Sequence, residues 1–566
     1  MIWAHGVAYS FGVIDLILRG GAVCDGTGAP TRTADVAIDG GRIAEIGRVT
    51  APARRVLDVA GLIVSPGFVD VHTHYDAQIT WDPLCTPSCW HGVTTVVLGN
   101  CGFSLAPCRS GDRDRLLRML EHVEGMPLES LRTGIRWSWE SVPEYLDMLR
   151  TTRLGLNVAA LAGHSALRVF VMGEAAYDRA ATDDEIARMQ ALVREAMAAG
   201  ALGFATARST GHVGEGGRPV PSRLATRDEL RALAAAMATG GRGVIEITPE
   251  TFPIDEDELS FLQDLTVETG RPASFSAILD LPERDGVWEP VWSRLQAGRA
   301  RGARVVPQVS CRPMRFEFDL VTGCASLDAL PAWKRFREAS DHAALLADPE
   351  FRTAVRAQTL GRPDAPSSKR WATVVVEETR DPAHQRFAGR TLADVAAARG
   401  GDVIDALFDL ALADDLGTRF SMLLLNYDDD RVGDLLRRPD GLIALSDAGA
   451  HVSVLCDAGY ATHFLGHWVR ERGLLPLEEA VRRLTSIPAD VYGIAGRGRL
   501  VPGAVADVTC FDAVRVGSRQ PERVTDFPGG APRWIVHSEG IAHVLVAGVP
   551  FLDAGECTGS LAGRVI

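Results

Sequence analysis

The stretch that decides the fold is Pro66-Gly67-Phe68-Val69-Asp70-Val71-His72-Thr73-His74, an apolar, β-prone run that ends in His-x-His. In an extended strand, side chains at positions i and i+2 point to the same face. His72 and His74 can therefore direct two imidazoles at one point, and imidazole is a common ligand of transition metals. His-x-His alone is a weak signal, but its place at the end of a strand-like run favours a metal site.

Two further strand-like runs end in groups that can bind a metal. The run 93–99 leads to Cys101, and the run 442–445 leads to Asp447. In a parallel α/β barrel, the carboxyl ends of the strands meet at the face that carries the active site. Three strand ends that each deliver a metal-ligand type of residue therefore predict a catalytic barrel.

Composition excludes several classes of protein. The 566 residues are 46% hydrophobic and 23% charged, with mean hydropathy +0.04, which is typical of a globular chain long enough for a large barrel with additions. A formal net charge of −14 and the absence of a long Lys/Arg run argue against nucleic acid or an anionic membrane as the main partner.

Location is predicted to be cytoplasmic. Ten cysteines are too sparse for a disulfide scaffold. No run approaches the roughly 18 apolar residues of a membrane span, and the start, residues 1–6, lacks the basic region of a secretory signal. Cys85 and Cys89 are interpreted as packing residues, because no second Cys/His pair follows at zinc-finger spacing.

The order of the elements predicts three parts. Short strands with turns occupy residues 1–65 and return in 500–566, so both ends contribute to one small β-sandwich domain. Between them, residues 66–499 alternate strand and helix as a parallel α/β barrel does. A segment of about 315–418, rich in charge and helix formers, breaks this rhythm and is interpreted as an insertion late in the barrel.

Local patterns fix several elements. Asp39-Gly40-Gly41 between alternating apolar residues predicts a hairpin. Residues 183–199 carry apolar side chains at helical spacing, which predicts a helix. Thr226-x-x-Glu229 is a capping-box pattern that predicts a helix start.

At this point the chain resembles a known family. The segment 65–74 after a β-rich amino end, together with 500–507 near the other end, is similar to the metal-dependent amidohydrolase superfamily. Within that superfamily, the segments 91–95 and 99–102 resemble the N-acyl-D-amino-acid deacylases, or D-aminoacylases. The resemblance covers nearly the whole chain and implies a (β/α)8 TIM-like barrel with zinc at the carboxyl ends of its strands.

The resemblance also assigns roles to individual residues. His72 and His74 match the first-strand metal ligands, and Cys101 matches the cysteine that binds metal in D-aminoacylases. Asp447 matches the last-strand aspartate, which binds metal and carries the proton of the attacking water as general base and acid.

One departure from the family concerns the fifth and sixth strands. D-aminoacylases carry a histidine at the end of each, but the corresponding runs here, 244–248 and 274–278, contain none. Glu246 is the candidate replacement ligand. We therefore expect one zinc per chain, held by His72, His74 and Asp447 with Cys101 near or bound, and two are not excluded.

Residues on the substrate side are harder to select. His164 follows a strand and could contact substrate, and His451, four residues after Asp447, could do the same or orient that carboxylate. A substrate carboxylate favours a bidentate guanidinium. Arg208 and Arg312 lie in loops after strands and are the candidates, with Arg223 a third that the sequence does not rank below them.

The predicted function is hydrolysis of the amide bond of N-acyl-D-amino acids or related N-acyl compounds, a small-molecule reaction that needs no nucleic acid or membrane. One alternative is a hydrolase of cyclic amides, of the hydantoin or dihydropyrimidine type, or of another C–N bond on the same barrel. A second, from a different class, is a metal-depleted barrel that only binds a ligand. The sequence leaves a homo-oligomer open.

Overall fold

The computed structural model describes residues 13–282, 284–323, 325–361 and 366–566. The start of the chain, on which the absence of a secretory signal was predicted, lies outside them. The described residues fall into two compact units. The first contains those up to Ile278, Trp288–Cys311 and Leu436–Ile566, and the second contains Leu279–Val287 and Arg312–Leu435.

An eight-stranded sheet forms the centre of the first unit. Its order is β6-β7-β8-β9-β10-β11-β12-β16, and each pair of neighbours is parallel. The strands are β6 (Phe68–Asp70), β7 (Val93–Leu98), β8 (Asn157–Gly163), β9 (Gly203–Ala207), β10 (Val244–Thr248), β11 (Ala273–Ile278), β12 (Val305–Val309) and β16 (Leu442–Ile443). Nearly all their residues are buried, as a parallel sheet covered on both faces requires.

The two edge strands of this sheet meet through the segments that follow them. Thr73 and Ala448 form a parallel bridge, and the backbone N–H of His74 donates to the carbonyl of Ala448 at 2.7 Å. The sheet is therefore consistent with the predicted TIM-like barrel. The same closure brings the residues after the first and last strands side by side.

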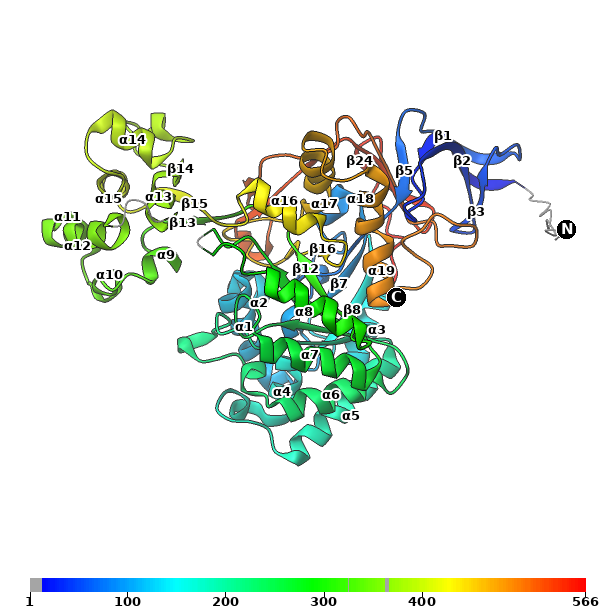
Figure 1. Cartoon of the computed structure of the whole chain (residues 1–566), viewed down its shortest axis with the longest axis horizontal. Coiled ribbons are helices and arrows are strands. Elements are labelled where there is room, and N and C mark those ends of the chain that lie inside the picture. Colours follow the sequence, from blue (N-terminus) through cyan, green and yellow to red (C-terminus); the bar gives the residue numbers. More distant parts are fainter. Residues whose placement is uncertain (1–12, 283, 324, 362–365) are drawn as a thin grey trace. The chain divides into compact units, whose positions relative to one another are not determined.

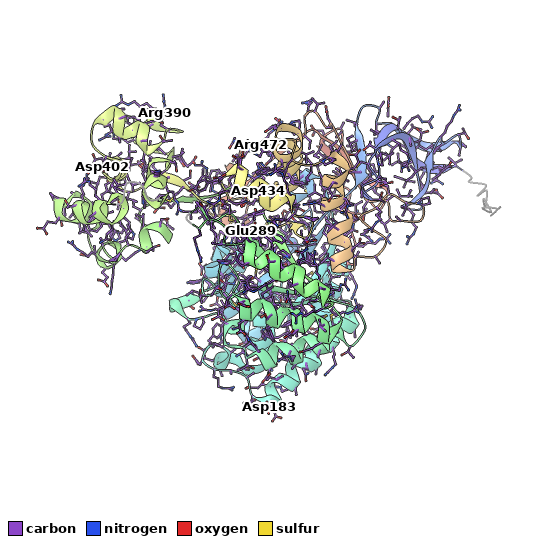
Figure 2. All side chains as sticks on the ribbon, viewed as in Figure 1. Asp183, Glu289, Arg390, Asp402, Asp434 and Arg472 are labelled. Carbon is purple, nitrogen blue, oxygen red and sulfur yellow. The ribbon has the colours of Figure 1, made fainter. Side chains whose placement is uncertain are left out.

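Helices connect the strands of this sheet (Figure 1). The longest is α5, whose bounds Asp183–Ala199 agree with the prediction, and Figure 2 labels Asp183 at its start. Thr182 and Glu185 form a capping box there, and the apolar face at Met189 and Val193 is buried. The other helices are α1 (Arg113–Glu124), α2 (Leu128–Gly134), α3 (Val142–Thr151), α4 (His164–Met172), α6 (Arg227–Ala238), α7 (Glu256–Thr269), α8 (Glu289–Ala300), α17 (Tyr460–His463), α18 (Leu477–Leu484) and α19 (Ser486–Tyr492).

Helix α6 begins where the capping pattern predicts, but only half of the capping box forms. The Thr226 side chain accepts a hydrogen bond from the backbone N–H of Glu229 at 3.2 Å. The Glu229 carboxylate does not return the bond, because it is held by His164 and Arg168 inside the unit. The Glu229 carboxylate therefore forms a buried ion pair instead of the cap hydrogen bond that the local pattern predicted.

A nine-stranded sheet combines both ends of the chain in the first unit. Its order is β24-β23-β22-β17-β5-β1-β2-β3, with β4 paired to β1. The predicted hairpin at Asp39-Gly40-Gly41 is confirmed, and it joins β2 to β3. The strands are β1 (Ile14–Val23), β2 (Arg32–Asp39), β3 (Arg42–Gly47), β4 (Ala53–Asp58), β5 (Ile63–Pro66), β17 (Val508–Phe511), β22 (Ile541–Val546), β23 (Val549–Asp553) and β24 (Glu556–Cys557). Its division into a two-sheet sandwich stays a prediction.

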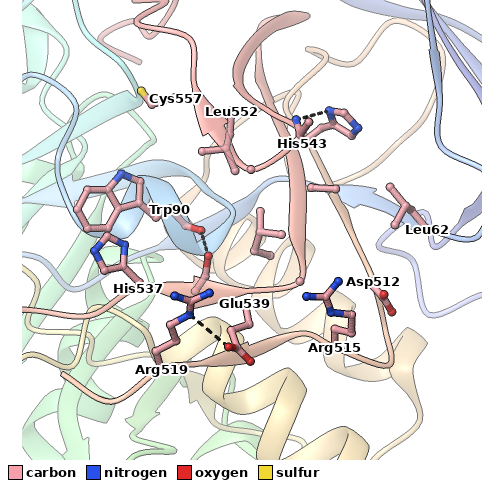
Figure 3. Close-up of a pocket in the computed structure, with 16 residues that line it drawn as sticks. Leu62, Trp90, Asp512, Arg515, Arg519, His537, Glu539, His543, Leu552 and Cys557 are labelled. Atoms are coloured by element: carbon pink, nitrogen blue, oxygen red, sulfur yellow. Dashed lines mark hydrogen bonds and ion pairs between the residues drawn. The ribbon is translucent and has the colours of Figure 1, made fainter. Parts of the chain in front are cut away.

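A cavity of about 730 Å³ lies along the carboxyl-terminal strands (Figure 3). The Trp90 and His537 rings stack in its wall with centroids 4.5 Å apart. The Arg519 guanidinium pairs with Glu539 at 3.2 Å. None of the site residues predicted from sequence lines this cavity.

The second unit has a core of its own. Three antiparallel strands, β13 (Met314–Phe318), β15 (Arg419–Leu425) and β14 (Val375–Glu378), form a small sheet. Trp333, Phe336, Phe351 and Phe408 are buried together among its helices. Those helices are α9 (Ala325–Asp328), α10 (Trp333–Glu338), α11 (His342–Ala347), α12 (Pro349–Leu360), α13 (Pro366–Ala372), α14 (Leu392–Arg399) and α15 (Val403–Ala413), while α16 (Asp429–Arg437) spans the boundary between the units. Across the described residues, no helix combines the length and apolar character that crossing a membrane needs.

Candidate metal centre

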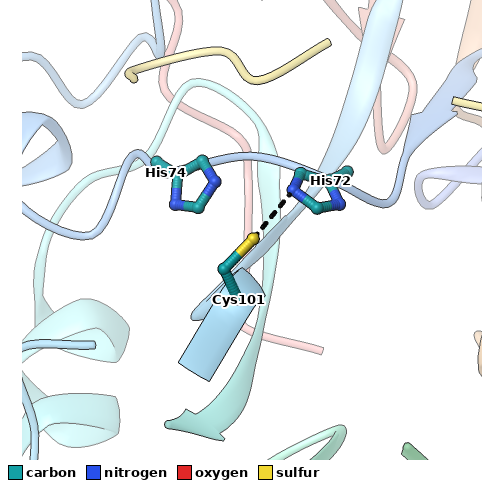
Figure 4. Close-up of side chains that lie close together, drawn as sticks. All are labelled: His72, His74 and Cys101. Atoms are coloured by element: carbon teal, nitrogen blue, oxygen red, sulfur yellow. Dashed lines mark hydrogen bonds between the residues drawn. The ribbon is translucent and has the colours of Figure 1, made fainter. Parts of the chain in front are cut away.

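Three of the predicted ligands converge at the carboxyl ends of β6 and β7. His72 and His74 follow β6, Cys101 follows β7, and all three side chains are buried. Their ligand atoms lie within 4.8 Å of one another, and Cys101 Sγ is 3.5 Å from His72 Nε2 (Figure 4). A thiol and two imidazoles at this spacing suit a zinc ion or a similar transition metal.

Asp447 follows β16, the edge strand at the other end of the sheet from β6, and its side chain reaches this group. Its Oδ1 lies 3.2 Å from His72 Nε2 and 3.7 Å from His74 Nε2. Burial raises the pKa of Asp447, but hydrogen bonds from the two histidines outweigh burial and hold that pKa well below its usual range. Asp447 is therefore ionised and able to accept a proton or bind a cation.

The orientation of His72 is fixed by a partner that the sequence did not reveal. His72 Nδ1 lies 2.8 Å from Oε1 of Gln308, whose Nε2 donates to Ser274 Oγ and Tyr492 OH. Because the Gln308 oxygen can only accept, Nδ1 carries a proton, and Nε2 is the nitrogen that faces Cys101 and Asp447 and would bind a cation. Gln308 is a polar residue within the apolar strand β12, and that contrast was the available signal.

Backbone strain concentrates at the same place. Cys101 (φ 55°), Asp447 (φ 45°) and His451 (φ 53°) all adopt the left-handed region that non-glycine residues rarely occupy. Such conformations cost about 1–3 kcal/mol each and persist where the surroundings impose them, often at functional sites. The strain falls on two predicted ligands and on a predicted substrate residue.

Glu246, the candidate replacement ligand, lies beside the three-residue cluster. Its Oε2 accepts the backbone N–H of Cys101 at 2.8 Å, and its Oε1 accepts Ser276 Oγ at 3.2 Å. Oε1 is also 3.9 Å from His72 Nδ1, and burial raises the pKa of Glu246 to about 7. Its oxygens thus hold the loop that carries Cys101, and its role as a ligand stays a prediction.

A second carboxylate, Glu124, reaches the site from the end of helix α1. Its Oε2 is 3.7 Å from His74 Nε2, and its side chain is only 3% exposed. Burial, with the nearby Asp447 charge, raises the pKa of Glu124 well above its usual range. The sequence offered no signal for it, because a Glu-Gly pair at a helix end is common and this helix begins far from any strand end.

Two further histidines, His451 and His212, lie near the metal centre. His451 is in the loop after Asp447, and burial lowers its pKa. His212 comes from the glycine-rich loop after β9 and lies against the Phe103 ring at 5.3 Å. Burial, with the field of His451 and His74, lowers the pKa of His212 to about 3, so its imidazole is neutral. The sequence analysis had not singled out His212.

Other predicted substrate residues have protein partners. His164 Nδ1 lies 2.9 Å from Thr206 Oγ1 and its Nε2 lies 2.9 Å from Glu229 Oε1, so both ring nitrogens are occupied. Arg208 pairs with Glu250 at 2.7 Å and with Glu258 at 3.1 Å. The Arg223 guanidinium donates to the backbone carbonyl of His212 at 3.1 Å, while Arg312 is a buried residue of the second unit.

Comparison with known proteins decides the family. A model described as Amidohydrolase family matches residues 55–551. The chain belongs to the amidohydrolase family. The match spans the whole eight-stranded sheet and part of the nine-stranded sheet, so it covers the residues that form the metal centre.

Several proteins that are similar over nearly the whole chain are deacylases. The chain is 32% identical to D-aminoacylase of Alcaligenes xylosoxydans xylosoxydans over 98% of this chain and 97% of the relative. It is also 32% identical to N-acyl-D-glutamate deacylase of the same organism, over 94% and 93%. The solved N-acyl-D-glutamate deacylase of Bordetella bronchiseptica, which holds zinc and a phosphonate mimic of the tetrahedral intermediate, is similar at TM-score 0.67 and 29% identity, covering 98% of this chain and 99% of that one. The amidohydrolase belongs with the D-aminoacylase-like branch.

Proposed function

We propose that this amidohydrolase cleaves the amide bond of N-acyl-D-amino acids or closely related N-acyl compounds, with a divalent metal, zinc, as cofactor. The observation that carries the proposal is the convergence of His72, His74 and Cys101 within 4.8 Å, with Asp447 3.2 Å from His72. The deacylase relatives and the zinc-containing structure supply the substrate class and the metal.

The residues of the site fit a divalent cation. His72 directs Nε2 toward Cys101 and Asp447 because Gln308 binds the opposite nitrogen, and His74 directs Nε2 toward the carboxylates of Asp447 and Glu124, 3.7 Å from each. Imidazole nitrogens, a thiol and carboxylates gathered in this way have the chemistry of a transition-metal site. With no histidine on β10 or β11, we propose one zinc held by His72, His74 and Asp447, with Cys101 near or bound.

The chemistry follows from the positions of the protein groups. A bound zinc would polarise the amide carbonyl as a Lewis acid and lower the pKa of water to about 7. Asp447, ionised between the two histidines, accepts the proton of the attacking water at a carboxylate oxygen. It then returns that proton to the leaving nitrogen, which departs as the free amine while the acyl group leaves as a carboxylate.

The test combines metal content with turnover. Elemental mass spectrometry on protein purified without chelator is expected to give about one zinc per chain. N-acetyl-D-amino acids should be hydrolysed, while the L-enantiomers and hydantoin or dihydropyrimidine rings serve as comparison substrates. Turnover of the rings alone would favour the cyclic-amide alternative, and absence of metal after reconstitution would favour the binding protein.

Several predictions from the sequence accompany this proposal. They are the domain boundaries at 1–65, 66–499 and 500–566, the insertion at about 315–418, and the β-sandwich built from both ends. The nine described cysteines are all free, which supports the predicted cytoplasmic location. His164, His451, Arg208 and Arg312 remain candidate substrate residues, and a homo-oligomer stays open.

A further inference from the structure

We infer that Glu124 is an additional ligand of the metal, contributed by a helix rather than by a strand end. This inference rests on the proposed metal-dependent function and extends it to a residue that neither the sequence motifs nor the resemblance assigned. Glu124 is the last residue of α1, and its carboxylate oxygen Oε2 lies 3.7 Å from His74 Nε2.

The distances around His74 Nε2 support this role. Glu124 Oε2 and Asp447 Oδ1 both lie 3.7 Å from that nitrogen. Ligands bound tetrahedrally at about 2.0–2.3 Å from a zinc ion are about 3.3–3.7 Å apart. Glu124 therefore has the separation from His74 that two ligands of one ion have, and it matches that of Asp447.

The Glu124 carboxylate is buried without a strong partner among the described residues. Its side chain is 3% exposed, its nearest ion-pair partner is His74 at 3.7 Å, and the other carboxylate near it, Asp447, carries the same charge. A buried carboxylate without a hydrogen bond or an opposite charge is strongly unfavourable. A divalent cation shared with Asp447 would supply the missing charge.

The backbone holds the two carboxylates at fixed positions. The N–H of His451, four residues after Asp447, donates to the carbonyl of Glu124. Ser453 Oγ donates to the carbonyl of Gly125 at 2.7 Å. The end of α1 is thus attached to the loop that carries Asp447, which is the arrangement expected if both carboxylates serve one ion.

The experiment measures zinc affinity of the full-length protein, by competition with a zinc indicator, for wild type, Glu124→Gln and Glu121→Gln. Glu121 is the matched control because it lies one turn earlier on α1 and is 35% exposed. Glu124→Gln keeps the size of the side chain and removes the charge. We expect the zinc Kd to rise at least about 10-fold for Glu124→Gln and to stay unchanged for Glu121→Gln.

Thermal unfolding of the metal-free proteins separates a ligand from a structural residue. Without a cation, Glu124 and Asp447 repel each other, so Glu124→Gln should leave the Tm of the metal-free protein unchanged or raise it. A rise in Kd of less than about threefold would overturn the inference, and so would a lower metal-free Tm. An unchanged Kd with a raised KM would instead assign Glu124 to substrate binding. Wild type that binds no zinc would overturn the proposed function itself.

Discussion

The metal centre and the cluster of His164, Arg168 and Glu229 are built from similar residues but differ in how their polar atoms are paired. Both are buried in the first unit and both combine imidazole with carboxylate. In the cluster, His164 uses both ring nitrogens and Glu229 uses both oxygens in hydrogen bonds of 2.5–2.9 Å. In the metal centre, the imidazoles face a thiol and two carboxylates at longer separations of 3.2–3.7 Å.

This difference indicates which buried charges are structural and which are functional. In the cluster, the imidazole and the carboxylate are fully hydrogen-bonded within the protein, so they need no ligand, although Arg168 Nε is buried without a partner among the described residues. In the metal centre, two imidazoles and a thiol present ligand atoms within 4.8 Å of one another, which is a combination that a cation fits. The predictions below therefore test the two sites with paired measurements of activity, metal binding and stability.

Replacing Asp447 should have the largest effect. Asp447→Asn removes the group that accepts the proton of water, and general acid–base catalysis contributes about 10²–10⁴-fold to rate. We expect kcat on an N-acetyl-D-amino acid to fall by about that factor, with unfolding unchanged in urea. Retention of more than about a tenth of wild-type kcat would contradict the assignment of Asp447.

Replacing Arg168 should instead affect stability. Arg168→Met leaves Glu229 buried without its cation, and breaking a buried pair costs about 3–5 kcal/mol. The free energy of unfolding in urea should fall by that amount, while zinc affinity stays at the wild-type value. The double replacement Arg168→Met with Glu229→Leu should recover much of the loss, because no unpaired charge remains. Equal losses in both variants would show that the ion pair is not the cause.

Removing the metal should have an intermediate effect on stability. A ligand present at 100 times its Kd stabilises the folded state by about 2.7 kcal/mol. A chelator should therefore lower the unfolding free energy of wild type by about that amount, and of Arg168→Met equally. Cys101→Ala should respond less to the chelator, because it has lost one of the ligands.

The sequence predicted the parts of the site that belong to strand ends. His72, His74, Cys101 and Asp447 each follow an apolar run, so the parallel barrel pattern alone was enough to bring them together. The alternation of strands and helices predicted a parallel α/β barrel, the resemblance implied its eight strands, and apolar periodicity predicted the helix α5.

The sequence could not predict residues that reach the site through tertiary packing. Glu124 arrives from a helix end, and Gln308 acts through its bond to His72, so neither has a local pattern. For Glu229, the sequence did contain a local pattern, but the pattern predicted the wrong hydrogen bond. Its capping-box position predicted a bond to the helix start, but an ion pair with Arg168 that depends on the folded arrangement outweighed that local preference.

The smallest predicted effect is the pH dependence of the paired cluster. Burial raises the pKa of Glu229, but His164 and Arg168 outweigh burial and lower it below the ordinary value of 4.5. A carboxylate with a lowered folded-state pKa adds stability that is fully present above about pH 5 and is lost as the pH falls through the folded-state pKa, at about 1.4 kcal/mol per unit of depression. Urea unfolding of wild type should therefore show a loss of stability between about pH 5 and pH 3 that is absent from the pH profile of Glu229→Gln. Because this cluster binds no metal, the difference between the two proteins should be the same with and without chelator, and a difference that depends on chelator would mean that the two sites are coupled.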